Sequence, residues 1–214
     1  MKYWIFDFDG TLVNTEGFFD QCFGYALEPF GHKIDSSYIE TIRHVHPLNI
    51  FDGLLGKNDA QIALKRLAEK GEEVADHMKP FAGIEEVLKT LSSENVGLAI
   101  WTGRDAASAR KILQKTNLDN YFEMLISGTC VENNKPNQEG LLRIVRSFGG
   151  PQDHHVMVGD HHHDVEPAKE MGCVSVHARW KDNPHELPEH IKADHQFDSV
   201  AAFHEWILKQ LKDD

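Results

Sequence analysis

Two aspartates separated by one residue close the first apolar run of the chain. Asp7 and Asp9 stand in the stretch IFDFDGT, residues 5–11, and Gly10 follows them. If the strand continues, an Asp-x-Asp pair places both side chains on one side, and the glycine allows a sharp turn. Two carboxylates this close raise each other's pKa, so they need a shared proton or a cation. The pair therefore indicates acid–base chemistry, metal binding or both.

Other residues able to do chemistry follow later apolar runs. Thr102 ends the run VGLAIWT, Asp160 ends HVMVGD, and Lys135 lies in the loop NNKPN. If these runs are neighbouring parallel strands, their carboxyl ends face one crevice together with Asp7 and Asp9. Mg²⁺ commonly takes one or two carboxylates, a carbonyl, waters and a substrate phosphate oxygen. We expect a Mg²⁺ site here, with Mn²⁺ or another divalent ion as an alternative.

The elements that must position these residues alternate between strands and helices. Short, β-rich runs typical of buried parallel strands cover residues 3–9, 96–102, 124–128, 155–160 and 173–178. Helical patterns lie between them at 84–95, 137–148 and 164–172. Asn137 and Asp164 are the expected N-terminal caps of the last two helices. The alternation predicts an α/β fold with a parallel sheet and right-handed crossovers.

One connection is much longer than a crossover helix requires. Residues 10–95 separate the first strand from the second, whereas an ordinary crossover holds a single helix. Residues 15–79 have mostly helical patterns, so we expect two domains: a core of residues 1–14 and 80–214, and a helical cap over the strand ends. Hinges are expected where the insert begins and ends. Additional packing against the core is the alternative interpretation.

Composition excludes several classes of partner. The chain has 34 acidic and 22 basic residues, a formal charge of −12, and no run rich in Lys or Arg. This disfavours nucleic acid polymers and anionic membranes, and no window is apolar enough to span a bilayer. The three cysteines are far apart without CxxC spacing, which favours a reducing cytoplasm. The sequence does not fix the oligomeric state, and a monomer is the favoured expectation.

Four motifs together resemble those of the haloacid dehalogenase superfamily, in order and in spacing. They are DFDGT at 7–11, Thr102 in WTGR, Lys135 in KPN and GDHHHD at 159–164, and the likeness spans residues 5–178. The similarity is to the branch that contains phosphoglycolate phosphatases and β-phosphoglucomutases. It implies a Rossmann-like parallel core with an inserted helical cap, and a phosphatase acting on a small phosphorylated metabolite.

The resemblance also implies a role for each acidic motif residue. Asp7 would attack phosphorus and form an aspartyl-phosphate. Asp9 would protonate the leaving oxygen and then deprotonate the hydrolytic water. Mg²⁺ would be held by the Asp7 carboxylate, the Asp9 carbonyl and Asp160, with Asp164 ordering waters or sharing coordination.

Binding of the phosphoryl group falls, by the same resemblance, to the second and third motifs. Thr102 and Gly103, with the amides that begin the following helix, would bind phosphoryl oxygens, as helix N-termini do. Lys135 would offset the charge of the phosphoryl group and of the nucleophile. Arg104 would either hydrogen-bond substrate or lie on the surface.

The sequence departs from the usual family pattern in the HHH run, residues 161–163. His161 follows the expected metal-binding aspartate, where a small hydroxyl residue is usual. An imidazole there could bias the site toward manganese, cobalt or nickel. Because consecutive histidines on a turn are expected to point in different directions, we predict no dedicated transition-metal site, and we expect Mg²⁺ to be the working ion.

Substrate choice is expected to lie in the insert, since the core handles only the phosphoryl group. Candidates to contact the leaving group are Arg43, His44, His46 and Lys57. A phosphosugar mutase is the alternative within the family, and a phosphonate hydrolase would need a lysine such as Lys33 or Lys57 for a Schiff base. A non-catalytic protein that binds a metal or ligand on the same fold is the alternative outside enzymes.

Overall fold

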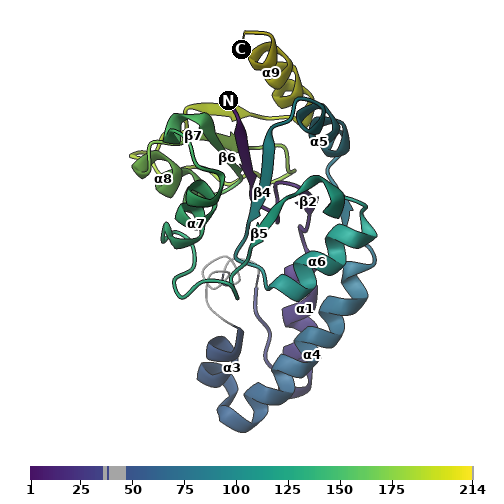
Figure 1. The fold of residues 1–214 in the computed structure, drawn as a ribbon. Coiled ribbons are helices and arrows are strands. Elements are labelled where there is room, and N and C mark those ends of the chain that lie inside the picture. Colours follow the sequence, from purple (N-terminus) through teal and green to yellow (C-terminus); the bar gives the residue numbers. More distant parts are fainter. Residues whose placement is uncertain (36–37, 39–46, 214) are drawn as a thin grey trace. The chain divides into compact units, whose positions relative to one another are not determined.

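The chain divides into two compact units in the computed structural model, which describes residues 1–35, 38 and 47–213 (Figure 1). The core unit comprises Met1–Asn14 and Lys79–Asp214, and the helical unit comprises Thr15–Met78. The two segments that join them pair with each other inside the core unit, where β2 (Val13–Asn14) runs antiparallel to β3 (Lys79–Pro80). Lys79, expected in the insert, thus belongs to the core unit. That the helical unit serves as a cap stays a prediction.

The core unit is built on a six-stranded sheet in which every pair is parallel, in the order β5-β4-β1-β6-β7-β8. The strands are β1 (Tyr3–Phe6), β4 (Gly97–Trp101), β5 (Met124–Ile126), β6 (His155–Gly159), β7 (Val174–Ala178) and β8 (His195–Phe197). The predicted α/β class and parallel sheet are confirmed. The analysis of the sequence missed β8, whose three residues, HQF, are too few to show a pattern. The strand order reverses between β1 and β6, which is where an open α/β sheet forms its ligand crevice.

Helices cover both faces of this sheet (Figure 1). They are α5 (Ile84–Ser93), α6 (Ala106–Lys115), α7 (Glu139–Phe148), α8 (His162–Glu170) and α9 (Val200–Asp213), with short 3₁₀ turns η2 (Asp119–Tyr121) and η3 (Gln152–His154). Successive side chains of β1 point to opposite faces of the sheet, as the two-residue period of a strand requires. Ile5 packs in a cluster with residues of α7 and α8, whereas Trp4 and Phe6 contact Phe203 of α9 through edge-on ring contacts.

Two helix starts differ from the prediction. α7 begins at Glu139, and Asn137 accepts a hydrogen bond from its amide (3.0 Å) from just outside the helix. α8 begins at His162 with His161 as its cap, and Asp164 lies in its first turn, where it accepts a bond from the His161 amide (3.2 Å). The imidazole Nδ1 of His161 accepts from the His163 amide (3.3 Å), a function usually served by Ser, Thr, Asp or Asn.

The described part of the helical unit contains α1 (Phe18–Leu27), the 3₁₀ turn η1 (Glu28–Phe30), α3 (Pro47–Leu55) and α4 (Lys57–Ala75). Its interior is aromatic, because Phe23 stacks on Phe19 at 4.4 Å and contacts Phe51 at 5.2 Å between ring centroids. Small residues of α4, Ala60 and Ala63, allow the helices to approach closely. This unit therefore has a hydrophobic core of its own.

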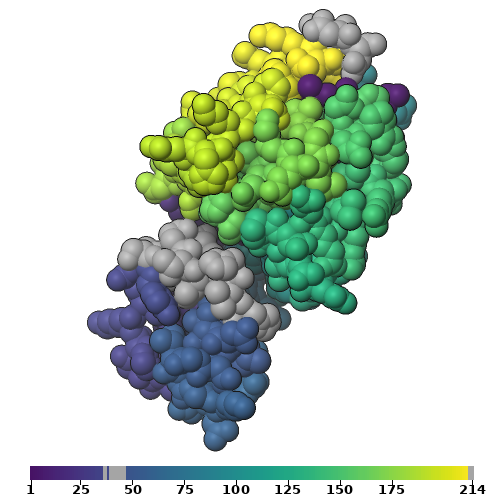
Figure 2. Space-filling model, turned by 90° about the vertical axis from the view of Figure 1, so that its left-hand side faces the viewer, coloured from purple at the N-terminus to yellow at the C-terminus, as the bar shows by residue number. Residues whose placement is uncertain are grey.

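The surface of the core unit combines segments far apart in sequence. In Figure 2 the green surface of the β6 and α8 region adjoins the teal surface of residues that follow β4. None of the described helices has the length and apolar character that a bilayer crossing requires.

Candidate active site

Two adjacent strands deliver carboxylates to the crevice where the strand order reverses. Asp7 follows β1, and its amide donates to the Val158 carbonyl of β6 (2.8 Å), so the ladder continues through it. Asp160 follows the last residue of β6, and Asp164 projects from the first turn of α8. All three side chains are buried, and one oxygen of each lies within 4.8 Å of the others. The expected convergence of these carboxylates is therefore present in the fold.

Lys135 lies at the centre of this cluster. Its Nζ donates to Asp7 Oδ1 (2.7 Å), to Asp164 Oδ1 (2.6 Å) and to the Trp101 carbonyl at the end of β4 (2.7 Å). The ammonium thus uses all three of its protons, and the lysine is only 9% exposed. This arrangement aligns the Asp7 carboxylate and prevents the lysine from moving freely.

The ionisation of the cluster reflects burial first and charge second. Burial raises the pKa of Asp7 well above its ordinary value, and repulsion from Asp164 and Asp160 raises it further against the opposing effect of Lys135. Burial likewise raises the pKa of Asp164, with a further contribution from Asp160. For Lys135, burial lowers the pKa, but the two carboxylates outweigh it and raise the value. Such a site stabilises added positive charge.

Two glycines allow the carboxylates to come this close. A side chain at Gly10, whose φ is +77°, would place its Cβ 2.5 Å from Asp160 Oδ2. A Cβ at Gly159 would stand 2.3 Å from Asp164 Oδ2. Real Cβ atoms do not approach oxygen so closely, so the glycines of DFDGT and GDHHHD are steric requirements of the cluster.

The second aspartate of the first motif is held by Arg104. Arg104 Nε donates to Asp9 Oδ2 (3.0 Å), and Nη2 forms a second bond to Asp9 Oδ1. Arg104 is thus paired with the proposed acid, and its contact with substrate stays a prediction. Thr102 is buried at the end of β4, and its hydroxyl accepts a bond from the Arg104 amide (3.1 Å).

The helix after Thr102 has fewer available amides than predicted. The Ala106 amide donates to Thr129 Oγ1 (3.2 Å), and the Ser108 amide donates to Asp105 Oδ1 (2.9 Å). Two of the amides expected to bind phosphoryl oxygens thus already have partners. Gly103, in the exposed turn before the helix, has open space where a side chain would be.

A second lysine, which the sequence analysis missed, reaches the same crevice. Lys181 Nζ lies 2.7 Å from Asp160 Oδ2, with the two side chains 10% and 8% exposed, and His185 Nε2 lies 3.8 Å from the same oxygen. Lys181 stands in the loop after β7, next to β6 in the sheet. The sequence did hold a signal for Lys181, because it follows a predicted strand. Loops that follow neighbouring parallel strands meet at one edge of the sheet.

The histidines of the HHH run do not diverge as predicted. The ring centroids of His161, His162 and His163 lie 4.0 to 4.3 Å apart, and the His185 ring is 4.9 Å from that of His161. The prediction was wrong because His161 caps α8 and turns its ring toward the His163 amide. Burial, with the neighbouring imidazoles, lowers the pKa of His161 to about 2.

The substrate residues expected in the insert are less well defined. Arg43, His44 and His46 lie outside the described residues, whereas Lys33 and Lys57 are exposed. A hollow of about 320 Å³ in the helical unit is lined by His32, Lys33, Ile34, Asp35, Tyr38 and Leu54.

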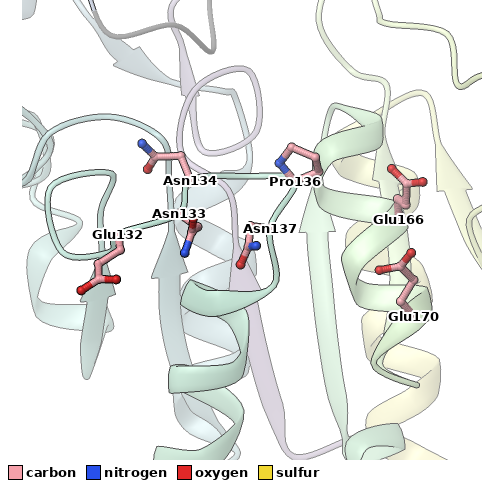
Figure 3. Close-up of a pocket in the computed structure, with 7 residues that line it drawn as sticks. All are labelled: Glu132, Asn133, Asn134, Pro136, Asn137, Glu166 and Glu170. Atoms are coloured by element: carbon pink, nitrogen blue, oxygen red, sulfur yellow. The ribbon is translucent and has the colours of Figure 1, made fainter.

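A second hollow, of about 620 Å³, lies on the core unit between the loop that precedes α7 and the helix α8 (Figure 3). Its lining residues are Glu132, Asn133, Asn134, Pro136, Asn137, Glu166 and Glu170. Three carboxylates and no cationic side chain line it, so it is poorly suited to an anionic phosphate ester. The carboxylate cluster, not this hollow, is the candidate active site.

The haloacid dehalogenase-like hydrolase family matches residues 4–178 of the chain. The chain belongs to this family. Pyrophosphatase PpaX of Halalkalibacterium halodurans is 31% identical over 193 residues, covering 80% of each chain. A phosphorylated carbohydrates phosphatase of Thermotoga maritima is 25% identical over 178 residues, covering 81% of this chain and 82% of that one. A structure from Haemophilus somnus, described as a predicted phosphoglycolate phosphatase, has a TM-score of 0.82 at 19% identity and covers 97% of this chain and 98% of that one, which shows the fold alone.

These relatives confirm the predicted family and the predicted class of enzyme, a phosphatase of the haloacid dehalogenase-like family. Of the site residues carried over from the motifs, Asp7, Asp160 and Asp164 gather around Lys135, whereas Asp9 pairs with Arg104.

Proposed function

We propose that the enzyme hydrolyses a small phosphorylated metabolite through a covalent intermediate on Asp7, with Mg²⁺ as its ion. The observation that carries the proposal is the Asp7 carboxylate at the end of β1, aligned by Lys135 and flanked by Asp160 and Asp164 within 4.8 Å. A buried carboxylate held in one orientation is a suitable oxygen nucleophile.

The first half of the reaction transfers the phosphoryl group to the protein. An Asp7 oxygen attacks phosphorus, the bond from phosphorus to the leaving oxygen breaks, and Asp9 donates a proton to that oxygen. Lys135 and the hydroxyl of Thr102 stabilise the charge on the transferring group. In the second half, Asp9 takes a proton from water, which attacks phosphorus and releases phosphate with restoration of the Asp7 carboxylate.

Asp9 must be released from Arg104 to act as an acid. Both oxygens of its carboxylate accept hydrogen bonds from the guanidinium, so neither faces the leaving group while the pair is intact. The phosphoryl oxygens of a bound substrate would compete for the same guanidinium. Arg104 thus couples arrival of the anionic group to release of the Asp9 side chain.

The carboxylate cluster also fits a hard divalent cation. Its donors are carboxylate oxygens, the type that Mg²⁺ prefers, and burial with mutual repulsion raises the pKa values of Asp7 and Asp164 in the absence of a sufficient counter-charge. Asp7 and Asp160 would hold the ion, with the Asp9 carbonyl, while Asp164 orders its surroundings. When bound, it would supply positive charge against the phosphoryl oxygens.

Phosphate release from a panel of small esters tests the proposal. The panel contains sugar phosphates, phosphoglycolate, pyrophosphate, nucleotides and an aryl phosphate, each with Mg²⁺ or with chelator. We expect hydrolysis that requires Mg²⁺ and falls by at least about 10³-fold in Asp7→Asn. The exposed Asp153→Asn serves as the matched control and should retain full activity.

Covalent trapping distinguishes this chemistry from direct attack by water. The native protein incubated with substrate and quenched in acid should carry one added phosphoryl group, located at Asp7 by peptide mass spectrometry. Turnover without a trappable intermediate, or turnover that survives Asp7→Asn, would contradict the proposal. Interconversion of sugar phosphates without net phosphate release would instead identify a mutase.

A further inference from the structure

We propose that His161, His162 and His163 form a second cation site, one that takes a borderline transition-metal ion of the Co²⁺, Ni²⁺ and Zn²⁺ class. The site lies at the start of α8, beside the carboxylate cluster, and uses a different ligand chemistry. It does not depend on the proposed phosphatase mechanism.

The geometry of the three imidazoles carries the inference. One ring nitrogen from each lies within 4.8 Å of the other two, and the centroid distances of 4.0, 4.2 and 4.3 Å show that the rings are gathered in one place. Imidazole nitrogens around Zn²⁺ stand about 2.0–2.1 Å from the ion, hence roughly 3.3 Å from one another in a tetrahedron. All three ligands belong to one turn of backbone. Side-chain rotation is therefore the only movement needed to bring their nitrogens to this distance.

A fourth imidazole stands next to the three. His185 comes from the loop after β7, and its ring lies 4.9 Å from that of His161 at an angle of 87°. Its Nε2 lies 3.8 Å from Asp160 Oδ2, and rotation of the ring toward the other three would supply the fourth ligand of a tetrahedral ion. The cluster therefore combines a local sequence run with a residue that only the fold brings near.

Two neighbouring positive groups disfavour binding of a cation by the imidazoles, and one neighbouring carboxylate favours it. The positive end of α8 and the Lys181 ammonium disfavour added positive charge, but Lys181 is neutralised by its contact with Asp160 (2.7 Å). Glu166 lies one turn along α8 from His162 and acts on it electrostatically. A carboxylate there suits the role of acceptor for the N–H of a metal-bound imidazole.

The interaction displaced at His161 is weak. Binding through Nδ1 of His161 would replace only the hydrogen bond from the His163 amide, which is long at 3.3 Å. The ligands also discriminate between ions: imidazole nitrogens suit Co²⁺, Ni²⁺ and Zn²⁺, whereas the carboxylate oxygens nearby suit Mg²⁺. The two sites can thus hold different ions together.

Calorimetric titration of metal-free full-length protein tests the site. Zn²⁺ and, separately, Co²⁺ are added in the presence of excess Mg²⁺, so that the carboxylate cluster does not compete for them. We expect one ion per chain bound at micromolar or lower concentration. His163→Ala and the more conservative His162→Asn should each weaken binding by about 10- to 100-fold, as loss of an imidazole ligand or its support does in other sites.

Two controls separate this site from others on the chain. His32→Ala, an exposed histidine of the helical unit, and Asp7→Asn should each leave the Zn²⁺ affinity within about twofold of the native value. Circular dichroism establishes that each variant is folded, and the visible absorption of Co²⁺ reports nitrogen ligation directly. Absence of stoichiometric binding, native affinity in both the His162 and His163 variants, or loss of binding in Asp7→Asn would each overturn the proposal.

Discussion

The core unit and the helical unit use charge in opposite ways. In the core unit, Lys135 and Asp7 form an ion pair whose side chains are 9% and 11% exposed. In the helical unit, Lys65 and Glu69 on α4 form a pair whose side chains are 80% and 52% exposed. A surface pair contributes about 0–1 kcal/mol, whereas burial of a pair incurs a desolvation cost that often exceeds its Coulomb energy. The buried charges of the core unit are thus better explained by a function in catalysis than by a contribution to folding stability.

The interior of the helical unit has the opposite character. Phe23 and Phe51 are nearly inaccessible to solvent and make its closest ring contacts together with Phe19. Among its described residues, no buried cluster of acidic or imidazole side chains is found. The difference predicts that changes in the core unit affect turnover most, while changes in the helical unit affect its own stability.

Replacement of Lys135 should have the largest effect. Lys135→Met removes the partner of two buried carboxylates, so we expect kcat/KM to fall by on the order of 10²–10⁴-fold, together with a loss of about 3–5 kcal/mol in stability. Steady-state kinetics and thermal unfolding measure the two effects. Lys65→Met on the surface of α4 is the matched control and should change neither. A fully active Lys135→Met would remove the functional reason for the buried pair.

Truncation of the aromatic interior tests whether the units are separate. Phe51→Ala should destabilise the helical unit by about 3–5 kcal/mol, because it leaves a cavity against Phe23. Hydrogen exchange measured by segment should show faster exchange in α1, α3 and α4 with unchanged protection in the core sheet. The exposed Ile62→Ala on α4 should remain within about 0.5 kcal/mol. Equal loss of protection in β1 would instead mean one cooperative structure.

Removal of Lys181 probes the second buried pair of the core unit. Because its ammonium occupies Asp160 Oδ2, Lys181→Met should strengthen Mg²⁺ binding about tenfold, equivalent to about 1.4 kcal/mol, which is close to the contribution of one charged hydrogen bond. Calorimetric titration measures the affinity without reference to turnover. The exposed Lys192→Met carries the same charge change and should shift the affinity by much less. Weaker binding in Lys181→Met would show that the lysine supports the ion rather than competing with it.

Removal of the Asp194 carboxylate, at the margin of the core sheet, should have the smallest effect on stability. Burial opposes ionisation of Asp194, but bonds from Lys169, the Ser175 amide and the Ser175 hydroxyl outweigh it and lower the pKa of this carboxyl. A lowered folded-state pKa stabilises the fold above the ordinary value near ~3.9 and loses that contribution as pH falls below it.

The pH dependence of unfolding by urea measures this contribution. Because Asp194 is 36% exposed and screened by solvent, we expect Asp194→Asn to cost about 1 kcal/mol or less at neutral pH. The difference from the native protein should diminish progressively below about pH 4. Asp198, whose side chain is 79% exposed beside Arg179, serves as the control, and Asp198→Asn should cost less at neutral pH. A difference that grows in acid would contradict the assigned direction.

The local pattern of the chain was sufficient for the scaffold and for the acidic residues of the site. Short, β-rich apolar runs predicted five of the six strands of the core sheet, because a buried parallel strand needs continuous apolar character. The spacing of Asp7, Asp9 and Asp160 relative to those strands predicted their common edge. The strand β8 escaped detection, since a three-residue strand is defined by its pairing with β7 and not by its own composition.

Only the tertiary structure decided which charges pair. Arg104 with Asp9 and Lys181 with Asp160 are partners separated by long stretches of chain, and no local pattern encodes their contact. The directions of the imidazoles in residues 161–163 depended in the same way on the capping of α8, a backbone geometry that the HHH run does not specify. The sequence by itself thus determined five of the six strands and the carboxylates at their ends, because these follow from local periodicity and spacing, and its four motifs indicated the family by resemblance. The fold determined the ionic and imidazole contacts, because side chains of distant segments meet only after the sheet has formed.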